Sequence, residues 1–280
     1  AGVSQKKVEA ASTGKLSVTG YQDYSDAQKI LKEVNKYRKK NGRKALKMDR
    51  GLTNSAIMRG FETTIYIPET SPHRRPNGKL SKSINKKIIY ENCAQSAGTT
   101  PKQIVKGWIN SSTHRKGLLL SNAKSVGVAA VTVVSRDGYE ANTWVLDFSS
   151  SKAKKVEKSK ARKQFTKNIV TKNSYLKKSY LKLDSRYGTI WETEKMQMKP
   201  TYQGKMMKEY GVYPTVINTS SFTSWKSSNP SVASVDSNGR IIGNKAGTAT
   251  ISAKLKTGTK ITISKKIKVI PTNQQIDPWE

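Results

Sequence analysis

The hydrophobic pattern of the chain changes period along its length, and this change most constrains the fold. Apolar residues recur every three to four positions up to about residue 110 and then alternate at every second position. The alternating segments VGVAAVTVV (126–134) and NTWVLDF (142–148) flank a turn at Asp137 and Gly138, which predicts an antiparallel hairpin. Helices followed by strands predict an α+β domain that ends near residue 150.

The clearest helix signal covers residues 25–42, SDAQKILKEVNKYRKKNG. Its apolar residues fall on one face, and Gly42 is a typical residue to end a helix. Ser25 and Gln28 have the spacing of a capping box, in which two side chains satisfy the free N–H groups of the first turn. We therefore expect the helix to start at Ser25.

Two further helices are expected before the hairpin. One starts after Asp49 and ends before Pro68. The other is announced by Thr100 as the N-cap and by Pro101 at the first helical position, where the missing N–H has no cost.

Shifts of composition divide the chain into five parts. Residues 1–22 are predicted to be a flexible N-terminus, and residues 23–150 the α+β domain. Residues 151–174 are rich in Lys and Ser and poor in large apolar residues, so we expect a basic linker there. Residues 175–272 carry short alternating segments with turn signals, which predicts an all-β sandwich, and residues 273–280 are a tail.

The charge is extreme: 52 Lys and Arg residues face 19 Asp and Glu residues, a formal net charge of +33. Such a chain attracts polyanions, among them anionic cell-wall polymers, acidic glycans and lipid head groups. No zinc-finger, RRM-like or homeodomain-like motif accompanies the charge, so we expect no specific nucleic-acid binding. No apolar run is long enough for a transmembrane helix. The single cysteine, Cys93, excludes an intrachain disulfide.

The chain has only two histidines, His73 and His114, and both lie in short polar segments that look like loops. Glu91 follows an apolar segment between them. Two imidazoles and a carboxylate that converge at one cleft would suit proton transfer or a divalent metal such as zinc, held by His73 and His114. The alternative is that both histidines are ordinary surface residues.

Five fragments, in the right order over residues 25–149, resemble the CAP superfamily (cysteine-rich secretory, antigen 5, pathogenesis-related 1) in its bacterial SCP-like form. The resemblance implies an α-β-α sandwich with a cleft at His73, Glu91 and His114. Cys93 stands where the family has Ile or Leu, so we expect it to fill core volume rather than act as a nucleophile. The fragments are NKYRKKNG with ALKMD, SPHRRPNG, YENCA, TPKQIVKGWINSSTHRKGLL, and SVGVAAV with NTWVLDF.

The chain departs from the family pattern at several positions. Tyr90 replaces a glycine next to Glu91, and Asn77 and Ser111 stand where some members carry an acid. The resemblance therefore leaves the fourth group of the cleft unassigned, with Glu62 and Glu69 as the nearby candidates.

Residues 205–270 resemble the bacterial group 2 Ig-like domain through WKSSNPSVASVDSNGRIIGNKAGTATISA. Gly239 and Gly247 are expected in turns with positive φ, and Trp225 in the core between the sheets. The long lead over residues 180–216 would supply the first strands together with an unusual insertion. Such domains occur on exported bacterial proteins, so the resemblance implies a secreted or wall-associated protein whose signal peptide has been removed.

Three functions fit these observations. The first is a binding module whose cleft takes a lipid-like or glycan ligand or a protein partner at the cell envelope. The second is a metal-assisted extracellular hydrolase, with His73 and His114 holding the ion and Glu91 as general base. The third is an adhesin in which the CAP domain is only a scaffold.

Overall fold

The computed structural model describes residues 12–68, 73–185 and 187–274. None of the helices in these ranges is long and apolar enough to cross a membrane. The helices are α1 (Tyr24–Lys40), α2 (Arg50–Thr63), α3 (Pro101–Asn110), α4 (Ser112–Leu118) and α5 (Lys205–Glu209), with 3-10 turns at Ser81–Ile84, Asn173–Tyr175, Lys178–Tyr180, Thr219–Ser221 and Thr272–Gln274. The strands are β1 (Thr13–Asp23), β2 (Lys47–Met48), β3 (Ile88–Ser96), β4 (Ser125–Val134), β5 (Glu140–Ser149), β6 (Arg162–Lys172), β7 (Leu181–Asp184), β8 (Thr189–Trp191), β9 (Lys195–Gln197), β10 (Lys199–Tyr202), β11 (Thr215–Val216), β12 (Phe222–Ser227), β13 (Ala233–Val235), β14 (Arg240–Gly243), β15 (Gly247–Leu255) and β16 (Thr262–Ile270).

The chain forms two compact units, and neither is continuous in sequence. We call them the α-β unit and the β unit. Within the β unit, the backbone N–H of Lys15 donates to Oγ1 of Thr257 over 2.8 Å, which joins two residues 242 positions apart. The α-β unit comprises Ser17–Ile169 and Thr201–Ile217, and the β unit comprises Ala1–Leu16, Val170–Pro200 and Asn218–Glu280.

A six-stranded sheet is the centre of the α-β unit, with strand order β3-β5-β4-β1-β6 and with β2 paired to β4. Strands β4 and β5 are antiparallel over their whole length, from Ser125 opposite Ser149 to Val134 opposite Glu140. The predicted hairpin is therefore confirmed. Strand β3 forms one edge of the sheet, a position that leaves its outer side open for the candidate site.

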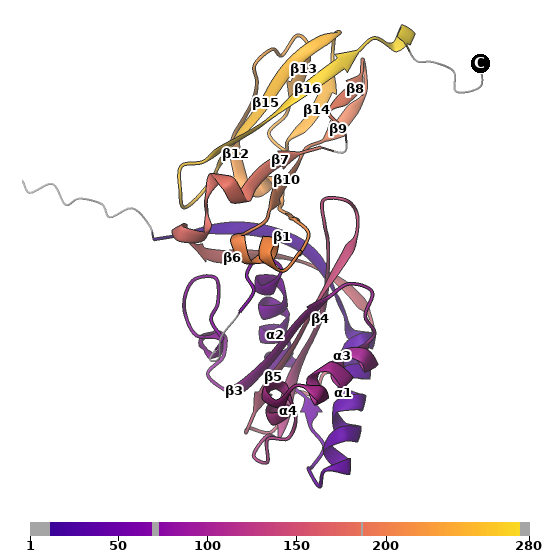
Figure 1. The fold of residues 1–280 in the computed structure, drawn as a ribbon, viewed down its shortest axis with the longest axis vertical. Coiled ribbons are helices and arrows are strands. Elements are labelled where there is room, and N and C mark those ends of the chain that lie inside the picture. The colour runs from indigo at the N-terminus through magenta and orange to yellow at the C-terminus, as the bar shows by residue number, and fades with distance from the viewer. Residues whose placement is uncertain (1–11, 69–72, 186, 275–280) are drawn as a thin grey trace, which may run out of the picture. The chain divides into compact units, whose positions relative to one another are not determined.

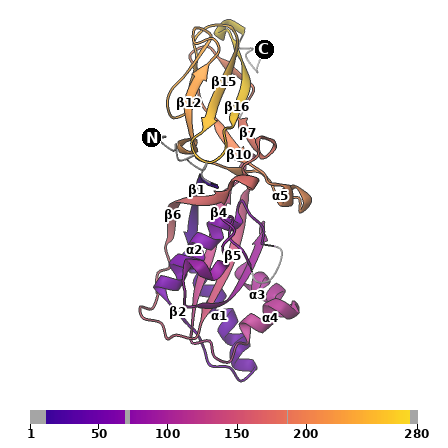
Figure 2. The same cartoon turned by 90° about the vertical axis from the view of Figure 1, so that its left-hand side faces the viewer.

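Helices cover both faces of this sheet (Figures 1 and 2). The first seven residues of β4 are all buried, as expected for a strand with cover on two sides. Val126 and Val128 join the apolar cluster of α1 and α3, represented by Ile30. Gly127 faces α2, where a Cβ atom would lie 2.2 Å from the Leu52 carbonyl oxygen. The predicted α-β-α sandwich is confirmed.

Helix α1 starts earlier than predicted. Its N-cap is Asp23, whose side chain accepts a hydrogen bond from the backbone N–H of Asp26 over 2.9 Å. The predicted capping box at Ser25 and Gln28 is wrong, because β1 leads directly into Asp23 and the first turn is already capped. The Gln28 amide instead donates to the Glu157 carbonyl oxygen over 3.0 Å.

The other helix starts agree with the sequence. Asp49 accepts from the backbone N–H of Leu52, and Thr100 and Gln103 form a complete capping box at α3. His114 was expected in a loop just past the third helix, but it lies in the short helix α4. Ser111 separates the two helices with an extended backbone, so the helical pattern resumes rather than ends.

Strand β1 lies in the segment 1–22 that the sequence marks as flexible; residues before 12 lie outside the described part. The even-numbered residues from Gly14 to Gln22 are buried in β1 together with Ser17, but the Gly, Ser, Thr and Lys residues among them weaken the apolar alternation that indicates a strand. Gln22 explains the local order: its amide donates to the Val128 carbonyl oxygen over 3.1 Å and accepts from the Ala130 N–H over 2.8 Å.

The predicted linker 151–174 is also structured. Its first part is fastened where Asp49 accepts a hydrogen bond from the backbone N–H of Lys154 over 2.8 Å. Its second part is β6, the far edge strand of the sheet, in which Ile169 and Thr171 are buried. An edge strand that buries few residues and exposes lysines has the composition of a linker, and lysines are common on such edges.

The β unit contains two sheets, β12-β15-β16-β8 and β13-β14-β9. This confirms the predicted all-β C-terminal region, and Gly239 and Gly247 have the expected positive φ of 71° and 147°. Trp225 does not lie in the core between the sheets. It is half-buried, covers Gly239 and contacts Phe222 edge-on at 6.4 Å between ring centroids.

The long lead over residues 180–216 divides between the two units. Strands β7, β8 and β9 supply the β unit as predicted, whereas residues 201–217 belong to the α-β unit. The predicted Ig-like region 175–272 is therefore interrupted. The inserted segment closes on itself where Tyr202 pairs with Thr215 in the antiparallel strands β10 and β11.

Candidate functional site

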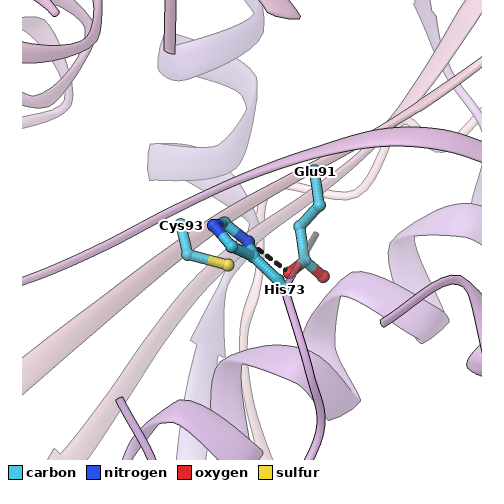
Figure 3. A group of neighbouring side chains, drawn as sticks. All are labelled: His73, Glu91 and Cys93. Atoms are coloured by element: carbon cyan, nitrogen blue, oxygen red, sulfur yellow. Dashed lines mark hydrogen bonds and ion pairs between the residues drawn. The ribbon is translucent and has the colours of Figure 1, made fainter. Parts of the chain in front are cut away.

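His73 and Glu91 meet at the open edge of the sheet (Figure 3). Glu91 comes from edge strand β3, and His73 precedes the turn at Ser81, whose backbone N–H donates to the His73 carbonyl oxygen over 2.9 Å. The imidazole Nδ1 lies 2.9 Å from Oε1 of Glu91. An ionised carboxylate only accepts hydrogen bonds, so Nδ1 carries a proton, and in the neutral form of the imidazole Nε2 is left as an acceptor.

The guanidinium group of Arg59, on α2, binds the carboxylate of Glu91 through two hydrogen bonds. Its Nε and Nη2 donate to the two carboxylate oxygens over 2.8 Å and 2.9 Å, and its side chain is fully buried. Burial alone would raise the pKa of Glu91, but the hydrogen bonds from His73 and Arg59 lower it well below its usual range. Glu91 is therefore a fixed, charged acceptor that sets the tautomer of His73.

The network continues inward to Glu62, which the sequence offers as a fourth acidic group. Arg59 Nη1 donates to Glu62 over 2.5 Å, and Arg75 donates to it over 2.6 Å. Glu62 thus forms ion pairs with both arginines and is separated from Glu91 by the guanidinium group of Arg59. The other candidate, Glu69, lies outside the described residues.

Asp147 of β5 is an acid that the family pattern did not reveal. It stands directly opposite Glu91 in the β3–β5 register, and neither of its buried carboxyl oxygens has a hydrogen-bond partner among the described residues. Burial and the negative charge of Glu91 raise its pKa well above the usual range. The pKa values of these two neighbouring carboxyl groups therefore shift in opposite directions, that of Asp147 upward and that of Glu91 downward.

Cys93 lies on the same side of β3 as Glu91, and Figure 3 shows its sulfur beside the His73–Glu91 pair. Burial and then the charge of Glu91 raise the thiol pKa well above the usual range. A nucleophilic cysteine needs its thiolate form. The environment of Cys93 therefore favours a neutral thiol that fills space.

His114 reaches the site from α4. Its Nδ1 lies 3.0 Å from Oγ of Ser111, so it hydrogen-bonds to that side chain rather than to His73 or Glu91. Burial lowers its pKa, and the imidazole of His73 lowers it further. The structure therefore gives a neutral imidazole at this position at pH 7.

Tyr90 and Asn92 fix α4 against β3. The Tyr90 hydroxyl donates to the Thr113 carbonyl oxygen and the Asn92 amide to the His114 carbonyl oxygen, each over 2.9 Å. Gly117 packs directly on both side chains, since a Cβ there would lie 2.8 Å from them. The glycine-to-tyrosine departure beside Glu91 thus supports the helix that carries His114.

His73, Glu91 and His114 all line one cavity of about 220 Å³. Its wall is apolar on the side of the 3-10 turn and the start of β3, with Leu80, Ile88 and Ile89. Lys82 adds a cation at the rim. The complete lining is His73, Leu80, Ser81, Lys82, Ile88, Ile89, Tyr90, Glu91, Asn92, Thr113 and His114.

The donor atoms do not make a complete metal site. His73, Glu91 and Cys93 offer ligand atoms within 4.8 Å of one another. However, Glu91 already accepts bonds from Arg59 and His73, and a protonated thiol is a poor ligand. The remaining donors are the imidazole nitrogens of His73 and His114, fewer than the three protein ligands of a typical catalytic zinc site. Zinc at these two histidines stays a prediction.

Two functional residues, Arg59 and Asp147, were missed by sequence reasoning, although both leave a signal. Asp147 is the only charged residue in the apolar strand segment NTWVLDF, and Arg59 interrupts the small and apolar residues of AIMRGF. A lone charge in a buried segment indicates a partner. The sequence does not say which one.

Comparison with known families gives two matches. The family of cysteine-rich secretory proteins (CAP) matches residues 31–148, and the bacterial Ig-like domain (group 2) matches residues 203–265. The first range includes all three predicted cleft residues. The second begins within the segment 201–217, which packs in the α-β unit.

Individual relatives match about half of the chain. The uncharacterized protein YkwD of Bacillus subtilis is 31% identical over 130 residues, 45% of this chain and 48% of its own length, so the chain spans about half of that relative. An outer surface protein of Borrelia burgdorferi is 17% identical with a TM-score of 0.34, over 44% of this chain and 92% of that one. An extracellular SCP-domain protein of Bacillus anthracis is 18% identical with a TM-score of 0.32, over 44% and 41%.

Proposed function

Because this chain carries a domain of the cysteine-rich secretory protein (CAP) family followed by a group 2 bacterial Ig-like domain, we propose that it is a secreted bacterial binding protein of the cell envelope. Its cleft at His73, Glu91 and His114 takes a small ligand or a group of a larger partner. The net charge of +33 supports this location, because it suits a surface rich in anionic polymers.

One observation carries the binding function: Nε2 of His73 is an acceptor held ready in the cavity. Glu91 fixes the tautomer, Arg59 fixes Glu91, and the His73 side chain remains 18% exposed. A ligand with a hydrogen-bond donor would meet Nε2, while its apolar part would lie on Leu80 and Ile89. Convergent polar groups on a partly apolar wall are typical of small-molecule sites.

The metal-assisted hydrolase has less support. A general base needs a free lone pair and a pKa near the working pH. Both oxygens of Glu91 accept from Arg59, and its pKa is lowered, so its geometry fits a positioning role better than proton abstraction. The adhesin with a CAP scaffold has no observation of its own in its favour.

The two histidines make a selective experiment possible. Because the chain has only two imidazoles, a ¹⁵N spectrum of the histidine side chains reports on this cleft alone. We expect the resonances of both His73 and His114 to move, to saturation, when a low-molecular-weight digest of bacterial cell wall is added. In Glu91→Gln the same addition should give a weaker and non-saturating response.

Tyr187→Ala, at an exposed tyrosine of the β unit, serves as the matched control and should behave as the wild type. If the digest shifts backbone amides elsewhere but neither imidazole, the cleft function is wrong. If stoichiometric Zn²⁺ instead shifts both imidazoles with a Kd tighter than about 1 µM, the metal-assisted function gains the support that the binding module loses.

A further inference from the structure

A second cavity lies in the α-β unit, away from the histidines. Its volume is about 270 Å³, and it shares no lining residue with the first. One wall is the edge of the sheet at β3, β4 and β5, and the other is the inserted segment 201–217. All of its lining residues belong to the α-β unit.

The insertion is firmly attached where it forms this wall. Thr215 Oγ1 donates to the Thr64 carbonyl oxygen over 2.7 Å, and the Arg136 N–H donates to the Pro214 carbonyl oxygen over 3.2 Å. Helix α5 ends at Glu209, and Gly211 just beyond it has a φ of 66°, which lets the chain turn toward the sheet. The wall is therefore built by specific contacts rather than by a passing loop.

Two exposed tyrosines line this cavity, and a third stacks on one of them. Tyr210 and Tyr213 line it and are 64% and 55% exposed, and Tyr213 stacks on the 62% exposed Tyr139 with 5.6 Å between ring centroids. Large side chains that stay exposed in a fixed stack offer flat apolar faces at little entropic cost. They form a platform for a flat ligand.

Polar groups inside the cavity are neutral. The Asn142 amide nitrogen has no hydrogen-bond partner among the described residues, while its oxygen accepts from Thr132. The Gln95 amide nitrogen donates to the Thr63 carbonyl oxygen, so the side-chain oxygen of Gln95 remains as an acceptor for a ligand. Ser96 Oγ accepts from the Trp144 indole over 2.7 Å, and its own proton remains to donate.

The absence of charge in this cavity is informative. None of its lining residues is Asp, Glu, Lys, Arg or His, although charged residues make up 25% of the chain. An anionic ligand would meet no cation here, so this cavity favours neutral ligands, whereas the basic surface of the chain attracts anions. Its size lies near the lower end of ligand sites, roughly 300–1,000 Å³, which suits one ring rather than a long chain.

We propose that this cavity binds a neutral pyranose sugar with an acetamido group, that is, an N-acetylhexosamine unit of a glycan. The apolar C–H face of the ring would stack on Tyr213. The acetamido group would exchange hydrogen bonds with Asn142 and Gln95, and its methyl would lie on Val133 and Val212. This site is separate from the cleft of the proposed function and does not depend on it.

Isothermal titration calorimetry with the β-1,4-linked trimer of N-acetylglucosamine tests the proposal on the full chain. We expect saturable binding that is equal at about 0.05 M and 0.5 M NaCl, because no charge is involved. Tyr213→Ala should weaken it by about three- to tenfold, the size of a lost stacking contact. Asn142→Ala should weaken it to a similar degree.

Two control variants separate the site from general damage. Tyr213→Phe keeps the ring and should bind like the wild type, and so should Tyr187→Ala in the β unit. Circular dichroism melting shows whether Tyr213→Ala is folded. Absence of saturable binding, or binding unchanged in both Tyr213→Ala and Asn142→Ala, would overturn the proposal. Equal binding of maltotriose would overturn its acetamido part. The histidine resonances, which report the first cleft, should not respond to this sugar.

Discussion

Glu91 and Asp147 are neighbours across β3 and β5, yet their pKa values shift in opposite directions. Arg59 reaches both oxygens of Glu91 and keeps it ionised. Asp147 has no such partner among the described residues, and burial together with the adjacent charge raises its pKa well above the usual range. The guanidinium group of Arg59 therefore contributes to the difference between the pKa values of these two adjacent carboxyl groups.

This difference predicts a pH-dependent stability. Between its ordinary pKa and its raised folded pKa, Asp147 holds a proton in the folded state that the unfolded state has lost. The free energy of unfolding therefore decreases as pH rises, by up to about 1.4 kcal/mol per pH unit. Asp147→Asn lacks this proton, so we expect urea unfolding to show it more stable than wild type at pH 7 and about equal near pH 3.5.

Glu91→Gln tests the pKa shift in the opposite direction. The lowered pKa of Glu91 stabilises the fold above the ordinary carboxyl pKa, and this contribution is lost as pH falls toward its folded pKa. Removing the charge leaves Arg59 buried beside one acid fewer, so we expect a loss of about 3–5 kcal/mol at pH 7. For Asp147, the contradicting result is a free energy of unfolding that depends on pH in the same way in wild type and in Asp147→Asn.

Sequence reasoning found some of these residues and not others for a physical reason. His73, Glu91 and His114 stand in motifs, and the structure places all three at one cavity. Arg59 and Asp147 act through register and packing: α2 must lie over β3, and β5 must pair with β3, before either one meets Glu91. No local pattern contains that information.

At the scale of elements, α2 packs so closely on β4 at Gly127 that a side chain there would not fit. Gly127→Ala would place a Cβ atom 2.2 Å from the Leu52 carbonyl oxygen, on the backbone of α2. Backbone cannot move aside as a side chain does, so helix and sheet would have to separate. We expect a loss of at least about 3 kcal/mol in the free energy of unfolding, measured by urea denaturation.

Gly107→Ala is the matched control in α3, because nothing lies within 4 Å of the added Cβ. Alanine is the better helix former, so this variant should gain about 0.5–1 kcal/mol. Equal stability of Gly127→Ala and wild type would mean that α2 does not lie this close to the sheet.

Secondary-structure elements could be predicted where burial produces a regular hydrophobic pattern or where a cap is local in sequence. Strands β4 and β5 are apolar on the faces that both layers cover, and the caps at Asp49 and Thr100 are local. Strands β1 and β6 lie in segments dominated by lysine and small polar residues. Strand β1 pairs with β4 and β6 pairs with β1, and Gln22 is held by carbonyl and N–H groups of β4, far away in sequence.

At the scale of the whole molecule, the net charge predicts how strongly the protein is retained on an anionic polymer. A net charge of +33 should hold the protein on an anionic wall polymer through release of counterions. We expect retention on purified wall teichoic acid to fall by at least about tenfold between about 0.1 M and 0.5 M NaCl. A neutral dextran matrix should not retain the protein at either concentration. Retention that ignores salt would contradict an electrostatic attachment.

The sequence also indicated two regions of different character, and the structure agrees on both. It misplaced their limits because the chain passes between the units four times, after Leu16, Ile169, Pro200 and Ile217. Boundaries read from composition assume one segment per domain. Here β1 is divided between the two units after Leu16, and the inserted segment 201–217 belongs to a unit whose other residues end at Ile169.

The bond between Lys15 and Thr257 has a consequence for biogenesis. Lys15 is synthesised 242 residues ahead of Thr257, so this bond can form only after all of those residues have been made. The α-β unit must likewise wait for residue 217 before its second cavity has a wall. The α-β unit therefore has all of its residues once Ile217 is made, whereas the β unit still waits for Thr257, so the two units are completed in that order.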